Sequence, residues 1–76
     1  MKIKKALQTV VDHADKTKAV NYAVNYAKAA LEMNEGSHEF DVQVLYVLTN
    51  IHHWRGPVAK EVRQALKQHG DRINAI

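Results

Sequence analysis

The 76-residue sequence contains no cysteine, one proline and three glycines. Without cysteine, neither a disulfide bond nor a thiolate metal site can stabilise the fold, so this small chain depends on its apolar core or on a partner. The longest apolar run, residues 44–48, is far shorter than the roughly 20 residues that span a bilayer. We therefore expect no membrane segment and a single domain over residues 1–76.

The start of the chain, MKIKKAL, also lacks the features of an export signal. It is basic, but no long apolar stretch and no cleavage site with small residues follow it. The sequence thus predicts a cytoplasmic protein.

A catalytic constellation is missing as well. The sequence has no glycine-rich phosphate loop, no HExxH motif and no nucleophile accompanied by a base and an orienting group. The adjacent pair His52 and His53 would point about 100° apart on a helix, which is unsuited to one shared metal ion. We expect no enzyme, no cofactor and no metal site, and we interpret one histidine of this pair as a half-buried side chain beside Trp54.

What the sequence does contain is apolar residues at helical spacing. In residues 2–14 they recur in steps of three and four, which predicts an amphipathic helix. A second apolar stripe within residues 20–31 points about 120° away from the first, which favours a break at the DKTK segment. Asp15 or Thr17 would then be the N-cap of the second helix. The DKTK segment also permits one continuous helix.

A third helix is predicted over residues 40–54. Its central VQVLYVL has the composition of a strand, but the spacing of the longer run fits a helix. Gly36 suits the end of the preceding helix, and Ser37 can cap the new one. Because this segment is apolar around most of its circumference, we expect it to be the most buried element, with Trp54 closing the core.

A fourth helix is predicted over residues 57–68. Gly56 can adopt the left-handed conformation that ends the third helix, and Pro57 suits the first position of the fourth. Gly70 is expected to end the fourth helix, which leaves residues 70–76 as a loose tail. The predicted fold class is therefore all-α, a small bundle of about four short helices.

The second predicted helix carries an additional apolar face. Tyr22, Tyr26 and Met33 line up roughly 140° away from its first stripe. A helix that is apolar on two sides is either central in its own bundle or part of an interface. We predict that these three residues contact a second copy of the chain, as a homodimer, or another protein, and the central-helix interpretation stays open.

Charge is unevenly distributed along the chain. Residues 1–18 hold five lysines and two aspartates, residues 19–54 hold one lysine and four carboxylates, and residues 55–76 hold five basic and two acidic side chains. The basic ends either attract the acidic middle within the fold or form a surface for an acidic partner.

Residues 44–68 match the outline of a helix-turn-helix, in which two helices meet at a short turn that often contains glycine. The side chains that would contact nucleic acid are Arg55, Lys60, Arg63, Gln64 and Lys67. Three features count against this interpretation: His52 close to the turn, the apolar start of the second helix, and the small number of phosphate-binding side chains.

The run QVLYVLTNIHHWRGPVAKEVRQALK, with NYAKAAL before it, resembles short helical proteins carried by phages and prophages of Gram-positive bacteria. The resemblance implies a small accessory protein that acts by binding a macromolecule, and it assigns a role to no residue. We therefore predict a non-enzymatic interaction module that binds itself and a partner protein. The alternative is a small DNA-binding regulator that uses the helix-turn-helix.

Overall fold

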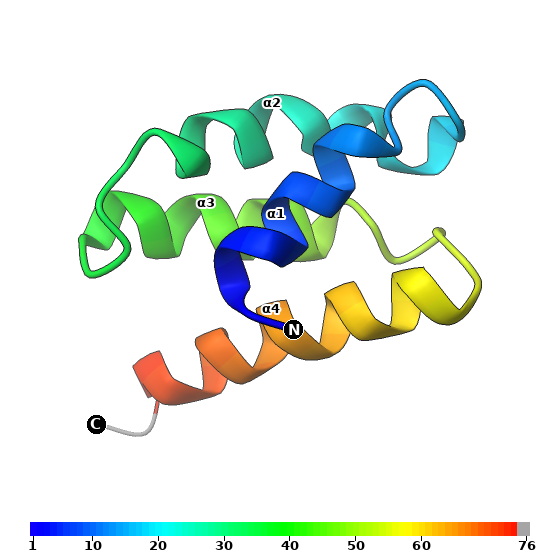
Figure 1. Cartoon of the computed structure of the whole chain (residues 1–76). Coiled ribbons are helices and arrows are strands. Elements are labelled where there is room, and N and C mark those ends of the chain that lie inside the picture. Colours follow the sequence, from blue (N-terminus) through cyan, green and yellow to red (C-terminus); the bar gives the residue numbers. More distant parts are fainter. Residues whose placement is uncertain (75–76) are drawn as a thin grey trace.

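The computed structural model describes residues 1–74, with side chains described up to residue 70, and it is all-α (Figure 1). Its helices are α1 (Ile3–Asp12), a short 3-10 helix η1 (Lys18–Val20), α2 (Asn21–Leu31), α3 (His38–Thr49) and α4 (Pro57–Asn74). The described residues contain no strand. The predicted fold class, a small bundle of about four helices, is confirmed. Within the described residues, no helix combines the length and the apolar character needed to cross a membrane.

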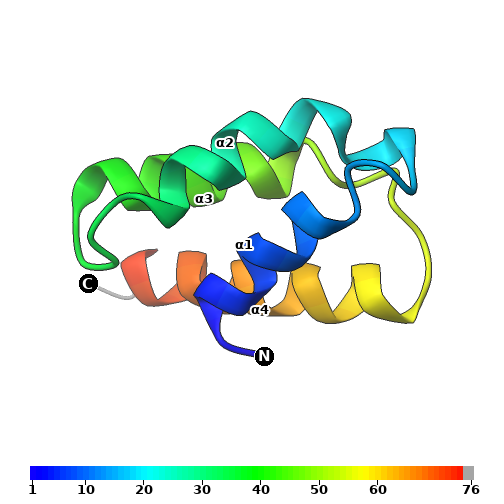
Figure 2. The same ribbon diagram turned by 45° about the horizontal axis from the view of Figure 1, so that its top comes forward.

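The helices contact one another in a closed ring. Helix α1 packs on α2 and α4, and α3 packs on the same two helices from the other side. Figure 1 and Figure 2 show α2 and α3 side by side, with α1 crossing between α2 and α4. Each helix therefore has one face in the core and one face turned to solvent.

The core is formed by apolar side chains from all four helices and from the segment before α4. The buried residues are Ala6, Leu7, Val10, Val20, Ala23, Val24, Ala27, Ala30, Phe40, Val44, Val47, Ile51, Trp54, Ala59, Val62, Ala65 and Leu66. Burial of each larger member stabilises the fold by roughly 1.5–3 kcal/mol, so this cluster supplies most of the favourable energy of a chain without cross-links.

Helices α1 and α2 are separate, so the possibility of one continuous helix is wrong. Helix α1 ends at Asp12, and a turn over residues 13–17 leads into η1. The Thr17 hydroxyl accepts a hydrogen bond from the Ala19 amide at 3.2 Å, so Thr17 caps η1, which leads directly into α2. The N-cap of α2 itself is Val20, which makes no side-chain cap, and not Asp15 or Thr17 as predicted. The break lets the apolar stripes of the two helices face the same core.

Helix α3 has the predicted cap, Ser37, but it begins at His38, before the predicted range of residues 40–54, and it also ends earlier than predicted. The Ser37 hydroxyl accepts a hydrogen bond from the Phe40 amide at 3.2 Å. Glu39 and Asp41 occupy the first turn, where the helix dipole favours negative charge. The helix ends at Thr49 and not at Trp54. The Asn50 side-chain amide donates to the Tyr46 carbonyl at 2.7 Å, in addition to the Asn50 backbone amide at 3.2 Å, and this local side-chain bond competes with continuation of the helix.

Two glycines, Gly36 and Gly56, were predicted to end helices, and neither does. Helix α2 ends at Leu31, several residues before Gly36, and Gly56 lies seven residues beyond the end of α3. Gly56 has a φ of 110°, so it still provides the left-handed corner, and Pro57 begins α4 as predicted.

Helix α4 passes through Gly70 and continues to Asn74, so the prediction that Gly70 ends it is wrong. Gly70 is buried, and a Cβ placed there would lie 3.8 Å from Leu45 Cδ2 on α3. A glycine inside a helix lowers helix stability by about 1 kcal/mol relative to alanine, and α4 continues through Gly70 despite this cost. Residues 70–74 are thus helical and not a loose tail, and residues 75–76 of that predicted tail lie outside the described part of the chain.

Candidate functional site

The outer side of α2 and α3 carries all three tyrosines of the chain. Tyr22 is 81% exposed, Tyr26 is 38% exposed and Tyr46 is 48% exposed. The rings of Tyr26 and Tyr46 pack together across the two helices, with their centroids 5.1 Å apart. We call Tyr22, Tyr26 and Tyr46 the tyrosine surface.

The tyrosines lie outside because α2 buries its small residues. Ala23, Ala27 and Ala30 face the core and allow close packing of α2 against its neighbours. Tyr22 and Tyr26, four residues apart, share the opposite face of the helix. The prediction that the second helix has two apolar faces holds in this sense: one face forms the core and the other is open to solvent.

Met33 differs from the two predicted tyrosines in its burial. It lies beyond the end of α2 and packs, half-buried, against the core. Sequence reasoning missed Tyr46, because α3 was expected to be the most buried element. Leu45 and Tyr46 are 47% and 48% exposed, so that expectation is wrong. The strongly apolar composition of α3 concealed which of its faces is turned away from the core.

Trp54 closes the core at the segment before α4, as predicted. It is buried, and the Arg63 guanidinium donates a hydrogen bond through Nη1 to the Trp54 carbonyl oxygen. The His13 ring packs beside the indole with centroids 5.2 Å apart, and His13 Nδ1 lies 2.9 Å from the Thr9 carbonyl oxygen. Arg63 and His13 thus tie α4 and the end of α1 to this segment.

One histidine of the pair His52 and His53 was expected to be half-buried beside Trp54, and the half-burial is wrong. Both side chains are exposed, and their rings lie 4.2 Å apart, centroid to centroid. His52 Nδ1 lies 2.7 Å from the Thr49 carbonyl oxygen at the end of α3. Among the described residues, no group of three or more histidines or carboxylates is arranged to hold a metal ion.

The opposite side of the molecule, formed by α1 and α4, is basic. We call its exposed lysines the basic surface: Lys2, Lys4, Lys5, Lys60 and Lys67. Helices α1 and α4 come from the two basic ends of the sequence, and the fold places them in direct contact. Among the side chains of residues 1–70, the one salt bridge joins His69 Nε2 to Asp41 Oδ1 at 2.8 Å. No lysine of the basic surface is therefore paired with a carboxylate of the acidic middle segment.

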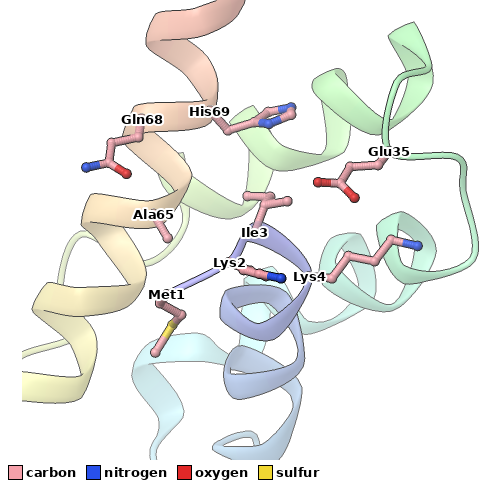
Figure 3. A pocket seen from close by; sticks show the side chains of 8 residues that line it. All are labelled: Met1, Lys2, Ile3, Lys4, Glu35, Ala65, Gln68 and His69. Carbon is pink, nitrogen blue, oxygen red and sulfur yellow. The ribbon is translucent and has the colours of Figure 1, made fainter.

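Two open pockets lie where α1 meets α4. One, of about 490 Å³, is lined by Lys2, Lys4, Glu35, Gln68 and His69 together with apolar side chains (Figure 3). The other, of about 350 Å³, is lined by Lys5, Glu61, Gln64 and Gln68, with Met1 and Ala65. Both linings mix long polar side chains with Met1 and Ala65, and neither is the enclosed apolar cavity that a small apolar ligand usually occupies.

The residues predicted to contact nucleic acid differ in how far they are exposed. Lys60, Gln64 and Lys67 are exposed along α4, and Arg55 is exposed before it. Arg63 is half-buried and engaged with the Trp54 carbonyl. The segment between α3 and α4 has seven residues, where a helix-turn-helix has a turn of roughly three to four.

No family model, no curated protein and no solved structure matches the chain.

Proposed function

We propose that the chain is a non-enzymatic protein-interaction module that associates with a second copy of itself and with a partner protein through the tyrosine surface. The observation that supports this most directly is the exposure of Tyr22, 81%, next to the packed pair Tyr26 and Tyr46. Tyrosine combines a large apolar ring with a hydroxyl that tolerates water, and it is enriched among the residues that dominate binding energy at interfaces.

The position of the tyrosines supports the same proposal. The core is already closed beneath them by small and β-branched side chains, so folding of the single chain does not require their burial. A set of exposed aromatic rings confined to one side of a small protein indicates an interaction site. The resemblance to phage proteins fits a binding role of this kind and adds no residue to it.

Sedimentation velocity of the double variant Tyr22→Lys/Tyr26→Lys tests the proposal. We expect the wild type to sediment as a dimer and the variant as a monomer with unchanged helical circular dichroism, because both side chains are exposed and the buried face of α2 is untouched. Val58→Lys is the matched control, since it replaces an apolar side chain of 40% exposure on α4. A dimer that survives the tyrosine changes, or a wild type that is monomeric at all concentrations, would contradict the self-association.

The alternative function, a DNA-binding regulator with residues 44–68 as a helix-turn-helix, has less support. The seven-residue connection is too long for the tight corner of that motif. Arg63, one of its predicted contacts, is engaged inside the protein.

A further inference from the structure

We infer that the basic surface of α1 and α4 binds the sugar-phosphate backbone of double-stranded nucleic acid, without a helix-turn-helix and with little dependence on sequence. This goes beyond the proposed protein–protein contact, because it uses the opposite side of the molecule and includes the lysines of α1. It also differs from the alternative considered above, since neither Arg63 nor the corner before α4 takes part.

The placement of the lysines supports an extended anionic partner. Lys60 and Lys67 are seven residues apart on α4, so they lie on one face about 10 Å apart along the axis. Gln64 lies between them on that face and offers a further hydrogen-bond donor. Lys5 of α1 lines the same pocket as Gln64, which extends the row of donors from one helix to the next. Phosphate groups along a duplex present a matching row of negative charge and acceptors.

The lysines are free to meet such a partner. None of them forms a salt bridge among the described side chains, and all five are exposed. Binding of phosphates would therefore release condensed counterions without breaking an ion pair of the protein.

The separation of the two surfaces favours a duplex over other anionic partners. Proteins that bind single strands stack bases on aromatic side chains, and helices that lie on membranes insert apolar side chains beside their lysines. Here the exposed tyrosines lie on α2 and α3, on the other side of the ring of helices. Apart from Met1, which is 49% exposed and lines both pockets, the basic surface offers mainly cations and amides, which contact with a phosphate backbone requires.

Two exposed carboxylates lie among the lysines of α1 and α4, Asp12 on the face of α1 that carries Lys5 and Glu61 on α4, and Glu61 provides a test in which binding should become stronger. Glu61 is exposed and lines the pocket that also contains Lys5 and Gln64. Its carboxylate would repel a phosphate bound there. Glu61→Gln should therefore strengthen binding, whereas the loss of a lysine should weaken it.

The experiment is fluorescence anisotropy of a labelled random-sequence 20-bp duplex, titrated with the full chain at several salt concentrations between about 50 and 200 mM. We expect micromolar binding at the lowest salt that weakens steeply as salt rises. In Lys5→Gln/Lys60→Gln/Lys67→Gln, the slope of log affinity against log salt should become smaller by about 2.7, because three phosphate contacts are lost. Each single variant should account for about a third of that change, which keeps the test informative should the triple variant not fold.

The matched control is Lys16→Gln/Lys18→Gln/Lys28→Gln. It removes the same charge from exposed lysines that lie on α2 and on the segment before it. We expect this variant to keep most of the wild-type slope. Equal losses in the two triple variants would overturn the inference, because net charge alone would then explain binding.

Three other outcomes would also overturn it: no binding of the duplex at low salt, tighter binding of anionic phospholipid vesicles than of duplex with the same lysine dependence, or weaker binding after Glu61→Gln. Tyr22→Lys/Tyr26→Lys adds positive charge on the other side, so its salt slope should stay close to that of the wild type.

Discussion

The outer side of α2 and α3 and the outer side of α1 and α4 differ in the chemistry that they expose. The first presents three tyrosines, and the second presents five lysines with interspersed glutamines. Both sides rest on the same core, to which all four helices contribute. The contact of α1 with α4 brings the basic segments from both ends of the chain together. The net charge of +3 therefore does not reveal that the two sides differ in charge.

A ring of helices lets a chain this short carry two chemically different surfaces. In a ring of four helices, each helix needs one face for the core and leaves another to solvent. The alanines of α2 make its buried face narrow, and its tyrosines are then available for contact. In α1 and α4, lysines and glutamines take most of the equivalent outward positions, with Asp12 and Glu61 among them.

Disruption of the shared core should unfold the chain and so remove the tyrosine surface and the basic surface together. Phe40 is fully buried and packs edge-on against the His69 ring, with centroids 5.3 Å apart. Phe40→Ala should lower the free energy of unfolding by about 3–5 kcal/mol, which is a large part of the stability of a domain this small. Urea denaturation followed by circular dichroism measures this. A loss below about 1 kcal/mol would mean that the two sides do not depend on this part of the core.

Arg63→Ala should show whether Arg63 stabilises the fold or contributes to duplex binding by the basic surface. The change leaves the Trp54 carbonyl without its donor, so we expect a loss of about 1–3 kcal/mol in unfolding free energy. The salt slope of duplex binding should hardly change. Lys60→Ala, at an exposed position of the same helix, should show the reverse: little change in stability and a smaller slope. An Arg63 variant of normal stability but weaker duplex binding would assign Arg63 to the basic surface.

Ser37→Ala should weaken the start of α3, the helix that carries Tyr46. The Phe40 amide loses the hydroxyl that accepts from it, and loss of such a cap costs about 1 kcal/mol. Hydrogen exchange should report faster exchange in the first turn of α3 and unchanged protection in the middle of α4. Unaltered exchange at Phe40 would show that the hydroxyl contributes little.

Gly70→Ala should have the smallest effect on stability, and it should stabilise the fold instead of destabilising it. A Cβ at this position meets Leu45 at an ordinary contact distance of 3.8 Å, and the glycine does not need a positive φ. We expect the midpoint of thermal unfolding to rise, by an amount that corresponds to at most about 1 kcal/mol. The salt slope of duplex binding should stay the same, because the substitution lies on the buried face of α4. A lower midpoint would mean that the methyl group forces α3 and α4 apart.

The sequence was sufficient for the fold class and for most helix starts. Helical spacing of apolar residues is a local signal, and the caps Thr17 and Ser37 act within three residues of the groups that they bind. Pro57 at the start of α4 is local in the same sense. Such features can be predicted without knowledge of how the helices pack.

The helix ends and the exposed side of α3 could not be predicted in this way. The end of α3 depends on side-chain hydrogen bonds to carbonyls of its last turn, and the apolar pattern continues beyond it. Gly70 remains helical where α4 passes close to α3. The exposure of Tyr46 and the contact of His13 with Trp54 depend on which helices are neighbours, which periodicity within one helix does not specify.

The contact between α1 and α4 has a consequence for how the chain acquires its structure. Its partners are separated by most of the polypeptide, so the entropy of closing a long loop opposes it until the intervening helices have already compacted. A fragment that stops before Pro57 would leave the inward stripe of α1 without its cover and should stay a collapsed, loosely ordered species. We therefore expect refolding to be all-or-none, with its rate governed by this last long-range docking event.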